Sequence, residues 1–195
     1  MKKYLLYLVP FVLLFMSCTP TLRGPFIIGN PYGAPIPYGE KRHPGIDFNI
    51  DIGTPVIAAT DSIIIHIGES AYAESWSGGI YVITSTGGDI ATLYSHLSKI
   101  AVTNGQSLKR GQLIGWSGAS NNGYPHLHFS LYRRTFNPIL FSNSFNPDQY
   151  WLDGKAQCFE RDRDYAKQNK KGMTLPVACG DYAKELLSLR EQKKP

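Results

Sequence analysis

Two short apolar runs, Ile63-Ile64-Ile65 and Ile80-Tyr81-Val82-Ile83, decide the fold class of this chain. Both are rich in β-branched and aromatic residues, which favour extended strands. Similar segments recur between residues 45 and 134, and glycine- or asparagine-rich turns separate them. The candidate strands cover residues 46–50, 55–59, 61–67, 79–85, 89–96, 113–116 and 126–132. Short strands at this regular spacing predict an all-β sandwich or barrel-like core.

The segments on either side of this core have a different composition. Residues 19–40 are rich in proline and glycine, which excludes a regular helix and indicates a tether followed by a loop that wraps onto the domain. Residues 181–194 have the pattern of an amphipathic helix, with Asp181 as a candidate N-cap and apolar Tyr182, Leu186 and Leu189 at helical spacing. We expect this helix to dock on the domain, in preference to binding a partner.

The N-terminus has the features of an export signal. Lys2 and Lys3 precede an apolar run over residues 4–16, which ends at Ser17-Cys18. A cysteine directly after the cut resembles the lipobox of bacterial lipoproteins, in which Cys18 is lipidated and becomes the new N-terminus. The alternatives are a cleaved signal with an incidental cysteine and an uncleaved anchor.

The cysteines and the net charge bound the class of protein further. With Cys18 set aside, Cys158 and Cys179 form an even pair in an exported chain, which indicates a disulfide. Two buried thiols are the alternative. The formal charge of +5 is mildly basic, and the sequence has no stripe of basic and aromatic residues of the kind that binds nucleic acid. We therefore expect no nucleic-acid partner, and the sequence leaves the oligomeric state open.

Histidine and aspartate are spaced as in a metal site. His43 and Asp47 occur as His-x-x-x-Asp, and His126 and His128 as His-x-His, while His96 lies between the two elements. Residues i and i+2 of a strand face the same side, so two strands can offer two side chains each to one site. A catalytic zinc typically takes three protein ligands of these types and keeps one position for water. Two histidines would then remain for proton transfer and oxyanion stabilisation.

Two further readings were weighed against this one. His66 follows an isoleucine run in a candidate strand and is predicted to be structural or exposed. The segment from Asn104 to Gly115 resembles the turn-strand pattern of biotinyl and lipoyl carrier domains. Lys109 lacks the sequence setting that a carrier lysine needs, so a carrier module is disfavoured.

Taken together, the motifs resemble the lysostaphin-type family of zinc endopeptidases, which cut peptidoglycan peptides. The segments that carry the match are His43-Pro44-Gly45-Ile46-Asp47-Phe48, Gly53-Thr54-Pro55-Val56-Ile57-Ala58-Ala59, Thr92-Leu93-Tyr94-Ser95-His96-Leu97, Gly105-Gln106 with Gly111-Gln112 and Ile114-Gly115, and Pro125-His126-Leu127-His128-Phe129. They cover about half the chain in the family's order. The resemblance implies a two-sheet antiparallel β domain with a groove over one sheet.

The same resemblance implies the roles of the site residues. The metal ligands map onto His43, Asp47 and His128, with one Zn²⁺ per domain, and the catalytic histidines map onto His96 and His126. Ser130 stands where an acidic residue is usual in the family, at a position that is not a ligand there.

The expected activity is zinc-dependent hydrolysis of peptide bonds in bacterial peptidoglycan, in a cross-link or a stem peptide. D-Ala to diaminopimelate and Gly-Gly bonds both remain open, as does which histidine is the general base. The alternative is a noncatalytic protein that binds the wall or activates another hydrolase. The expected organisation is a signal peptide (1–17), a lipidated N-terminus and tether (18–40), the endopeptidase domain (41–145) and a C-terminal extension with disulfide and helix (146–195). The expected location is the periplasmic or cell-surface side of a membrane, reached through the lipid anchor.

Overall fold

The structure, a computed structural model, describes residues 27–36, 42–69, 78–134, 141–165 and 172–192. Its strands are β1 (Ile27–Asn30), β2 (Ile46–Asn49), β3 (Pro55–Ile57), β4 (Ser62–Glu69), β5 (Ile80–Ser85), β6 (Ile90–Ile100), β7 (Ser107–Leu108), β8 (Leu113–Ala119), β9 (Pro125–Arg133) and β10 (Ser144–Phe145). Three single-turn 3-10 helices, Phe141–Asn143, Pro147–Gln149 and Leu152–Gly154, precede the helix α1 (Gly180–Gln192). The predicted all-β class with a C-terminal helix is confirmed.

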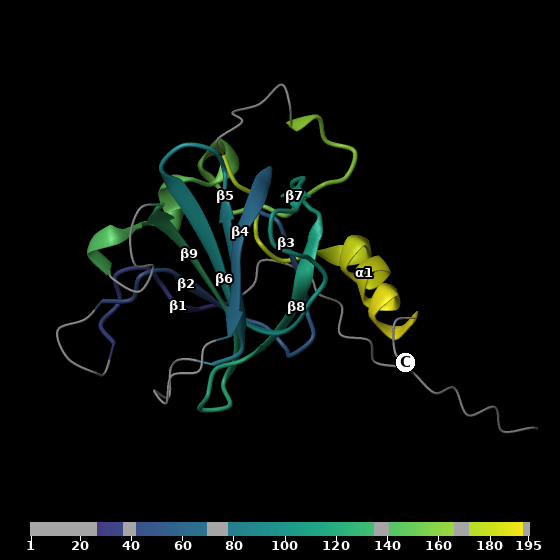
Figure 1. Cartoon of the computed structure of the whole chain (residues 1–195), viewed down its shortest axis with the longest axis horizontal. Coiled ribbons are helices and arrows are strands. Elements are labelled where there is room, and N and C mark those ends of the chain that lie inside the picture. The colour runs from purple at the N-terminus through teal and green to yellow at the C-terminus, as the bar shows by residue number, and fades with distance from the viewer. Residues whose placement is uncertain (1–26, 37–41, 70–77, 135–140, 166–171, 193–195) are drawn as a thin grey trace, which may run out of the picture.

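The paired strands run antiparallel and form one connected path, in the order β1-β2-β9-β8-β6-β5-β4-β7 with an additional β9–β6 pairing. In Figure 1, β9, β6, β5 and β4 lie side by side, and α1 lies beside β3 and β8. Strand β6 links the two parts of the sheet, because residues 90–95 pair with β9 and residues 97–100 pair with β8. The change of partner occurs at His96, whose φ of 62° interrupts the extended backbone.

The hydrophobic core explains why the predicted strands form. In β2, β5 and β9 buried residues such as Phe48, Val82 and Phe129 alternate with more exposed ones, as expected for a sheet with one face on the core. Tyr94 of β6 is fully buried, and its hydroxyl accepts a hydrogen bond from the Ala59 N–H at 3.0 Å. Each of these large side chains contributes roughly 1.5–3 kcal/mol by leaving water.

Several boundaries differ from the prediction. Strand β1 lies within the segment predicted as tether and loop, where it pairs with β2. Strands β7 and β10 are two residues long, too short to show an alternating pattern. Helix α1 begins at Gly180, so the prediction of Asp181 as N-cap is wrong. Asp181 lies in the first turn, where its carboxylate accepts a hydrogen bond from Lys184.

The C-terminal residues pack on the same core as the strands. Trp151, Met173, Leu175 and Val177 belong to one buried cluster with residues of β2, β6 and β9. The Ile57 N–H donates to the Pro176 carbonyl at 2.9 Å, which continues the sheet beyond β3. The extension is therefore an integral layer of the described structure.

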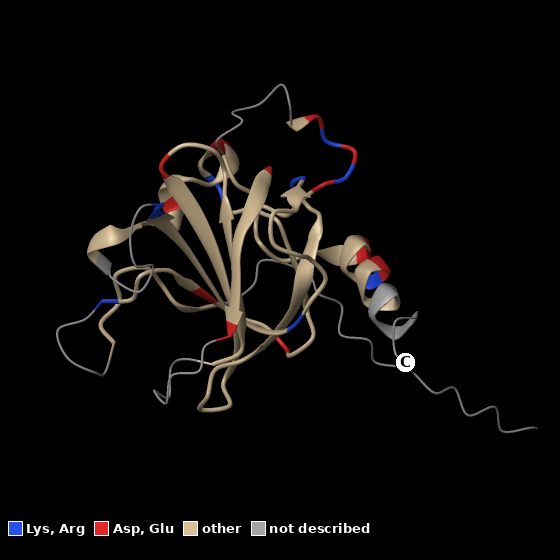
Figure 2. Ribbon diagram, viewed as in Figure 1, with Lys and Arg blue, Asp and Glu red and all other residues tan. Residues whose placement is uncertain are grey.

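Charged side chains in this region are paired with one another. Figure 2 shows basic and acidic residues close together along α1 and along the segment that precedes it. The closest contacts are Arg161–Glu185 at 2.8 Å, Arg163–Asp153 at 2.7 Å and Lys184–Asp181 at 2.7 Å. The predicted basic clusters at 167–171 and 193–194, the side chain of Leu189, and the proposed signal segment with Cys18 lie outside what the structure describes. Over the described ranges, no helix is long and apolar enough to cross a membrane.

Candidate metal centre

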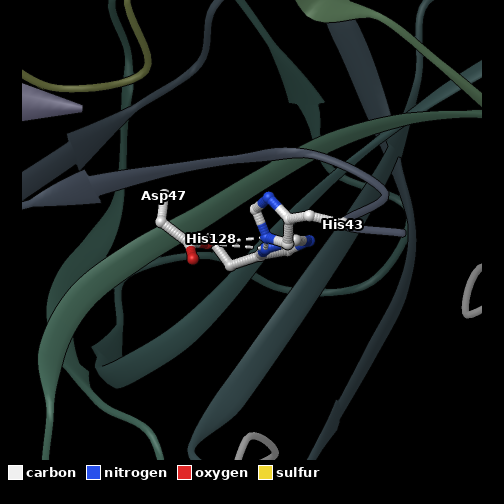
Figure 3. A group of neighbouring side chains, drawn as sticks. All are labelled: His43, Asp47 and His128. Atoms are coloured by element: carbon white, nitrogen blue, oxygen red, sulfur yellow. Dashed lines mark hydrogen bonds and ion pairs between the residues drawn. The ribbon is translucent and has the colours of Figure 1, made fainter. Parts of the chain in front are cut away.

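Two adjacent strands place the predicted ligands on one face of the sheet. Asp47 of β2 lies directly opposite His128 of β9 in the antiparallel register, so both side chains point the same way. His43 lies four residues before Asp47, after which the chain turns through Pro44 and Gly45 into β2. Figure 3 shows the three side chains pointing toward one another.

Three acceptor atoms converge in this group. His43 Nε2 lies 3.0 Å from His128 Nδ1 and 3.2 Å from Asp47 Oδ1, and His128 Nδ1 lies 2.8 Å from Asp47 Oδ1. Ligand atoms around a tetrahedral zinc with bonds of 2.0–2.1 Å are about 3.3 Å apart, so these separations fit one ion. His43 is buried, and Asp47 and His128 are half-buried.

The outer nitrogen of each ligand histidine is held by a fixed partner. His43 Nδ1 lies 3.1 Å from the Pro31 carbonyl oxygen, which can only accept, so Nδ1 carries the proton and Nε2 keeps its lone pair. His128 Nε2 lies 2.9 Å from Ser130 Oγ. Oriented partners of this kind are usual around metal-binding histidines. Three facing lone pairs without a proton between them are satisfied by a cation, and the donor set suits zinc.

The electrostatics of the group agree with a ligand role. Burial alone would raise the pKa of Asp47, but hydrogen bonds from His128 and His43 outweigh it and hold that pKa well below its usual range. Burial lowers the pKa of His128, opposed by the hydrogen bond to Asp47. An ionised carboxylate and a neutral imidazole are the forms that bind a metal.

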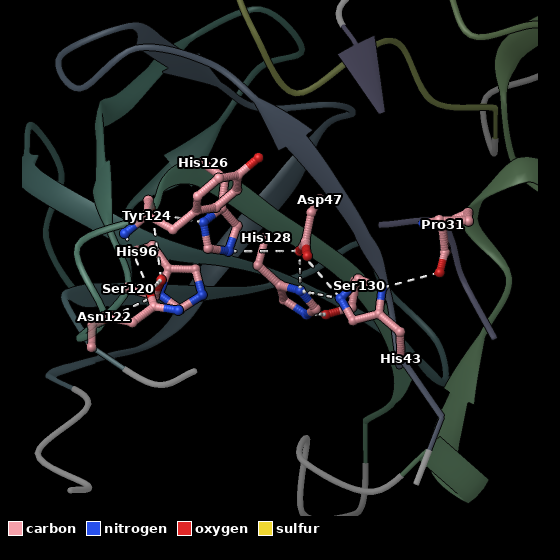
Figure 4. Close-up of polar contacts among 11 residues, drawn as sticks. Pro31, His43, Asp47, His96, Ser120, Asn122, Tyr124, His126, His128 and Ser130 are labelled. Carbon is pink, nitrogen blue, oxygen red and sulfur yellow. Dashed lines mark hydrogen bonds and ion pairs between the residues drawn. The ribbon is translucent and has the colours of Figure 1, made fainter. Parts of the chain in front are cut away.

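His96 and His126 lie next to this group and have their own fixed orientation. The His126 Nδ1–H donates to the Tyr124 carbonyl at 2.9 Å, and the His96 Nδ1–H donates to the Gly78 carbonyl at 2.8 Å. In both rings Nε2 is therefore free of the proton. His126 Nε2 lies 3.8 Å from Asp47 Oδ1, and the His96 and His126 rings are 4.4 Å apart between centroids (Figure 4).

The conformation and environment of His96 are unusual. Its positive φ is rare for a residue with a side chain, and such strain often marks functional sites. Gly79 packs against this backbone so closely that a Cβ there would lie 3.0 Å from His96 Cα. Burial, helped by repulsion from His126 and His128, lowers the pKa of His96 to about 3.

The five predicted site residues thus lie together, and the remaining histidine lies elsewhere. His66 is exposed on β4, where its Nε2 is 3.2 Å from the Tyr81 hydroxyl. The sequence gave no sign of the carbonyls of Pro31, Gly78 and Tyr124, because a main-chain acceptor does not depend on residue type.

Cys158 and Cys179 are joined by a disulfide with a Cα–Cα distance of 6.0 Å, as the even pair predicted. The bridge connects the segment after the last 3-10 turn to the residue that precedes α1. Neither cysteine belongs to the convergent group of potential metal ligands.

Comparison with known proteins agrees with this geometry. The chain is 43% identical over 100 residues to the peptidoglycan DD-endopeptidase ShyA of Vibrio cholerae, which covers 50% of this chain and 22% of that protein. It is 41% identical over 125 residues to lysostaphin of Staphylococcus simulans, which covers 62% of this chain and 23% of lysostaphin. The chain thus matches less than a third of the length of these curated relatives.

Solved structures extend the agreement to the fold. The catalytic domain of lysostaphin from Staphylococcus simulans superimposes with a TM-score of 0.54 at 35% identity, over 64% of this chain and 91% of that domain. Residues 41–140, which contain all five site residues, match the peptidase family M23. The lysostaphin-type resemblance predicted from the motifs is confirmed, and the chain belongs to peptidase family M23.

Proposed function

We propose that this protein is a zinc-dependent endopeptidase that hydrolyses peptide bonds in bacterial peptidoglycan. The observation that supports it most directly is the convergence of His43 Nε2, Asp47 Oδ1 and His128 Nδ1, beside two histidines that keep a free Nε2. Membership of the family and relatives named as peptidoglycan and glycyl-glycine endopeptidases support the same reaction class.

His43, Asp47 and His128 would hold one zinc ion. When bound, zinc supplies a Lewis acid that polarises a carbonyl oxygen and lowers the pKa of a water to about 7. The Asp47 carboxylate contributes the negative charge of the ligand set, and the two imidazoles are held as neutral donors by their outer hydrogen bonds.

His126 and His96 would handle the protons of the reaction. Each Nδ1–H is fixed on a carbonyl, so each Nε2 can accept a proton from the attacking water. Once protonated, the same Nε2–H can donate to the oxyanion that forms on the substrate carbonyl or to the departing amine. The 4.4 Å separation of the two ring centroids lets both reach one scissile bond.

The substrate that we propose is a peptide of the cell wall. ShyA is named as a DD-endopeptidase, and the relative ALE-1 of Staphylococcus capitis, 39% identical over 113 residues, is named as a glycyl-glycine endopeptidase. D-Ala to diaminopimelate cross-links and Gly-Gly bridges are therefore the two bond types to test.

The test is digestion of purified muropeptides of both bond types, with product identification by mass spectrometry. We expect His96→Ala and His126→Ala to lower turnover by about 10²–10⁴-fold while they keep zinc. His66→Ala is the matched control, because His66 lies outside the site and its loss should leave turnover unchanged. Zinc-loaded protein that cleaves neither substrate would contradict the proposal and favour a noncatalytic wall-binding protein or activator.

We also propose that the protein is exported and anchored through lipidated Cys18, with a tether at 18–40, the endopeptidase domain at 41–145 and the extension at 146–195. The basic and apolar start of the chain and the Ser17-Cys18 pair support this arrangement. The relatives' names place their substrates in the cell wall, which requires action outside the cytoplasm.

A further inference from the structure

A chain of hydrogen bonds continues from the metal group along β9. His128 Nε2 lies 2.9 Å from Ser130 Oγ, and Ser130 Oγ donates to the Tyr132 hydroxyl at 2.8 Å. These three residues are two apart on one strand, so their side chains share a face. Ser130 is 0% exposed and Tyr132 is 2% exposed, so water does not compete for these bonds.

The number of protons in this chain decides which nitrogen of His128 is protonated. A serine hydroxyl has one proton, and Ser130 gives it to Tyr132. The Ser130 oxygen can then only accept from His128, which requires the proton on His128 Nε2 and leaves the Nδ1 lone pair free. If the chain ran in the opposite direction, Ser130 would donate to Nε2 and the His128 proton would lie on Nδ1, between the ring and Asp47.

We propose that Ser130 and Tyr132 are positioning residues that hold His128 in the tautomer whose Nδ1 can bind the metal. This inference rests on the proposed function, because it assigns a supporting role within the same site. Outer partners of this kind fix the orientation of metal-binding histidines, and their loss typically costs 10–100-fold in metal affinity.

Packing shows why the position takes a small hydroxyl residue. Gly45 crosses β9 at this point, and a Cβ on Gly45 would lie 2.8 Å from Ser130 Cβ and 2.9 Å from His128 Cε1. A larger side chain at 130 would push against this crossing. Ser130→Ala removes the hydroxyl without adding volume, so it tests the hydrogen bond and preserves the packing.

The experiment measures zinc affinity by chelator competition for Ser130→Ala, Tyr132→Phe and the control Ser95→Ala. Ser95 lies opposite His128 on β6, but no hydrogen bond joins its side chain to the ring. We expect zinc affinity to fall about 10–100-fold in the first two variants and to stay within about twofold in the control. In Tyr132→Phe the Ser130 proton becomes available to His128 Nε2, so the metal-free variant should gain the Nδ1–H tautomer, measured by ¹⁵N NMR of the histidine rings.

Two results would overturn the inference. One is zinc affinity equal to wild type in both variants. The other is metal-free wild-type protein with the His128 proton on Nδ1, and this measurement decides the matter even if a variant does not fold. Wild-type protein that binds no zinc would instead refute the proposed function, so the two failures are distinguishable.

Discussion

Arg110 fastens the C-terminal extension to the domain, and its replacement should lower stability measurably. The guanidinium is 9% exposed, donates to the Gly172 carbonyl at 2.7 Å and the Ala59 carbonyl at 3.1 Å, and lies 4.8 Å from the centre of the Tyr165 ring. The Ala59 carbonyl also accepts from Thr174, so Arg110→Met leaves it satisfied.

The expected loss follows from the groups that remain without a partner. Gly172 oxygen loses the one donor that the described structure gives it, which costs about 1–3 kcal/mol. The stacking on Tyr165 adds about 0.5–1 kcal/mol. Relief of the buried guanidinium from desolvation offsets part of this. We expect a net loss of about 2 kcal/mol, which corresponds to roughly 4–8 °C in Tm for a chain of this size.

The matched control is Lys109→Met, which removes the same charge from the neighbouring residue. Lys109 is exposed and pairs with Asp61 at 3.0 Å, so its loss should cost less than about 1 kcal/mol. Urea denaturation of both variants gives the two free energies of unfolding, and elemental analysis should show unchanged zinc. Equal stability of Arg110→Met and Lys109→Met would refute the reasoning that the buried guanidinium joins the extension to the core.

Three further outcomes are expected. Asp47→Ala and His43→Ala should each lose most of the bound zinc by elemental analysis, because each removes one of three ligands, and stoichiometric zinc in either variant would remove that ligand from the assignment. Replacing Cys158 and Cys179 by Ala opens a loop with a sequence separation of 21 and should lower the free energy of unfolding by about 3 kcal/mol in urea, whereas unchanged stability would contradict the chain-entropy estimate. Cys18→Ser should release the protein from the membrane fraction with zinc binding and hydrolysis intact, and continued fractionation with membranes would end the lipoprotein proposal.

The sequence predicted the strands that bury large side chains and missed those that do not. Strands β2, β5 and β9 alternate buried and exposed residues, and the apolar pattern therefore marks them. Strand β6 continues four residues beyond its predicted end at His96, because the backbone bends there and resumes on a different partner. A change of strand partner is a tertiary event, and no local pattern records it.

The candidate site was predictable to the level of residue type and no further. The motifs named the five side chains, since imidazole and carboxylate at these spacings have few other uses. The motifs could not show which nitrogen of each ring faces the centre, because the Pro31, Gly78 and Tyr124 carbonyls set the orientation of His43, His96 and His126. The pairing of Arg110 with Gly172 was equally hidden, because a buried arginine among backbone carbonyls has no sequence signature.

The register between β2 and β9 is what turns two separate motifs into one site. Asp47 lies opposite His128 because Ile46 pairs with Phe129 and Phe48 pairs with Leu127, all four of them buried. A slip by one residue would turn these apolar side chains to the other face, at a cost of roughly 1.5–3 kcal/mol for each large one. The hydrophobic core therefore brings the three donors together without help from the ion. Metal-free protein should keep its fold, and this is why the tautomer of His128 can be measured before zinc binds.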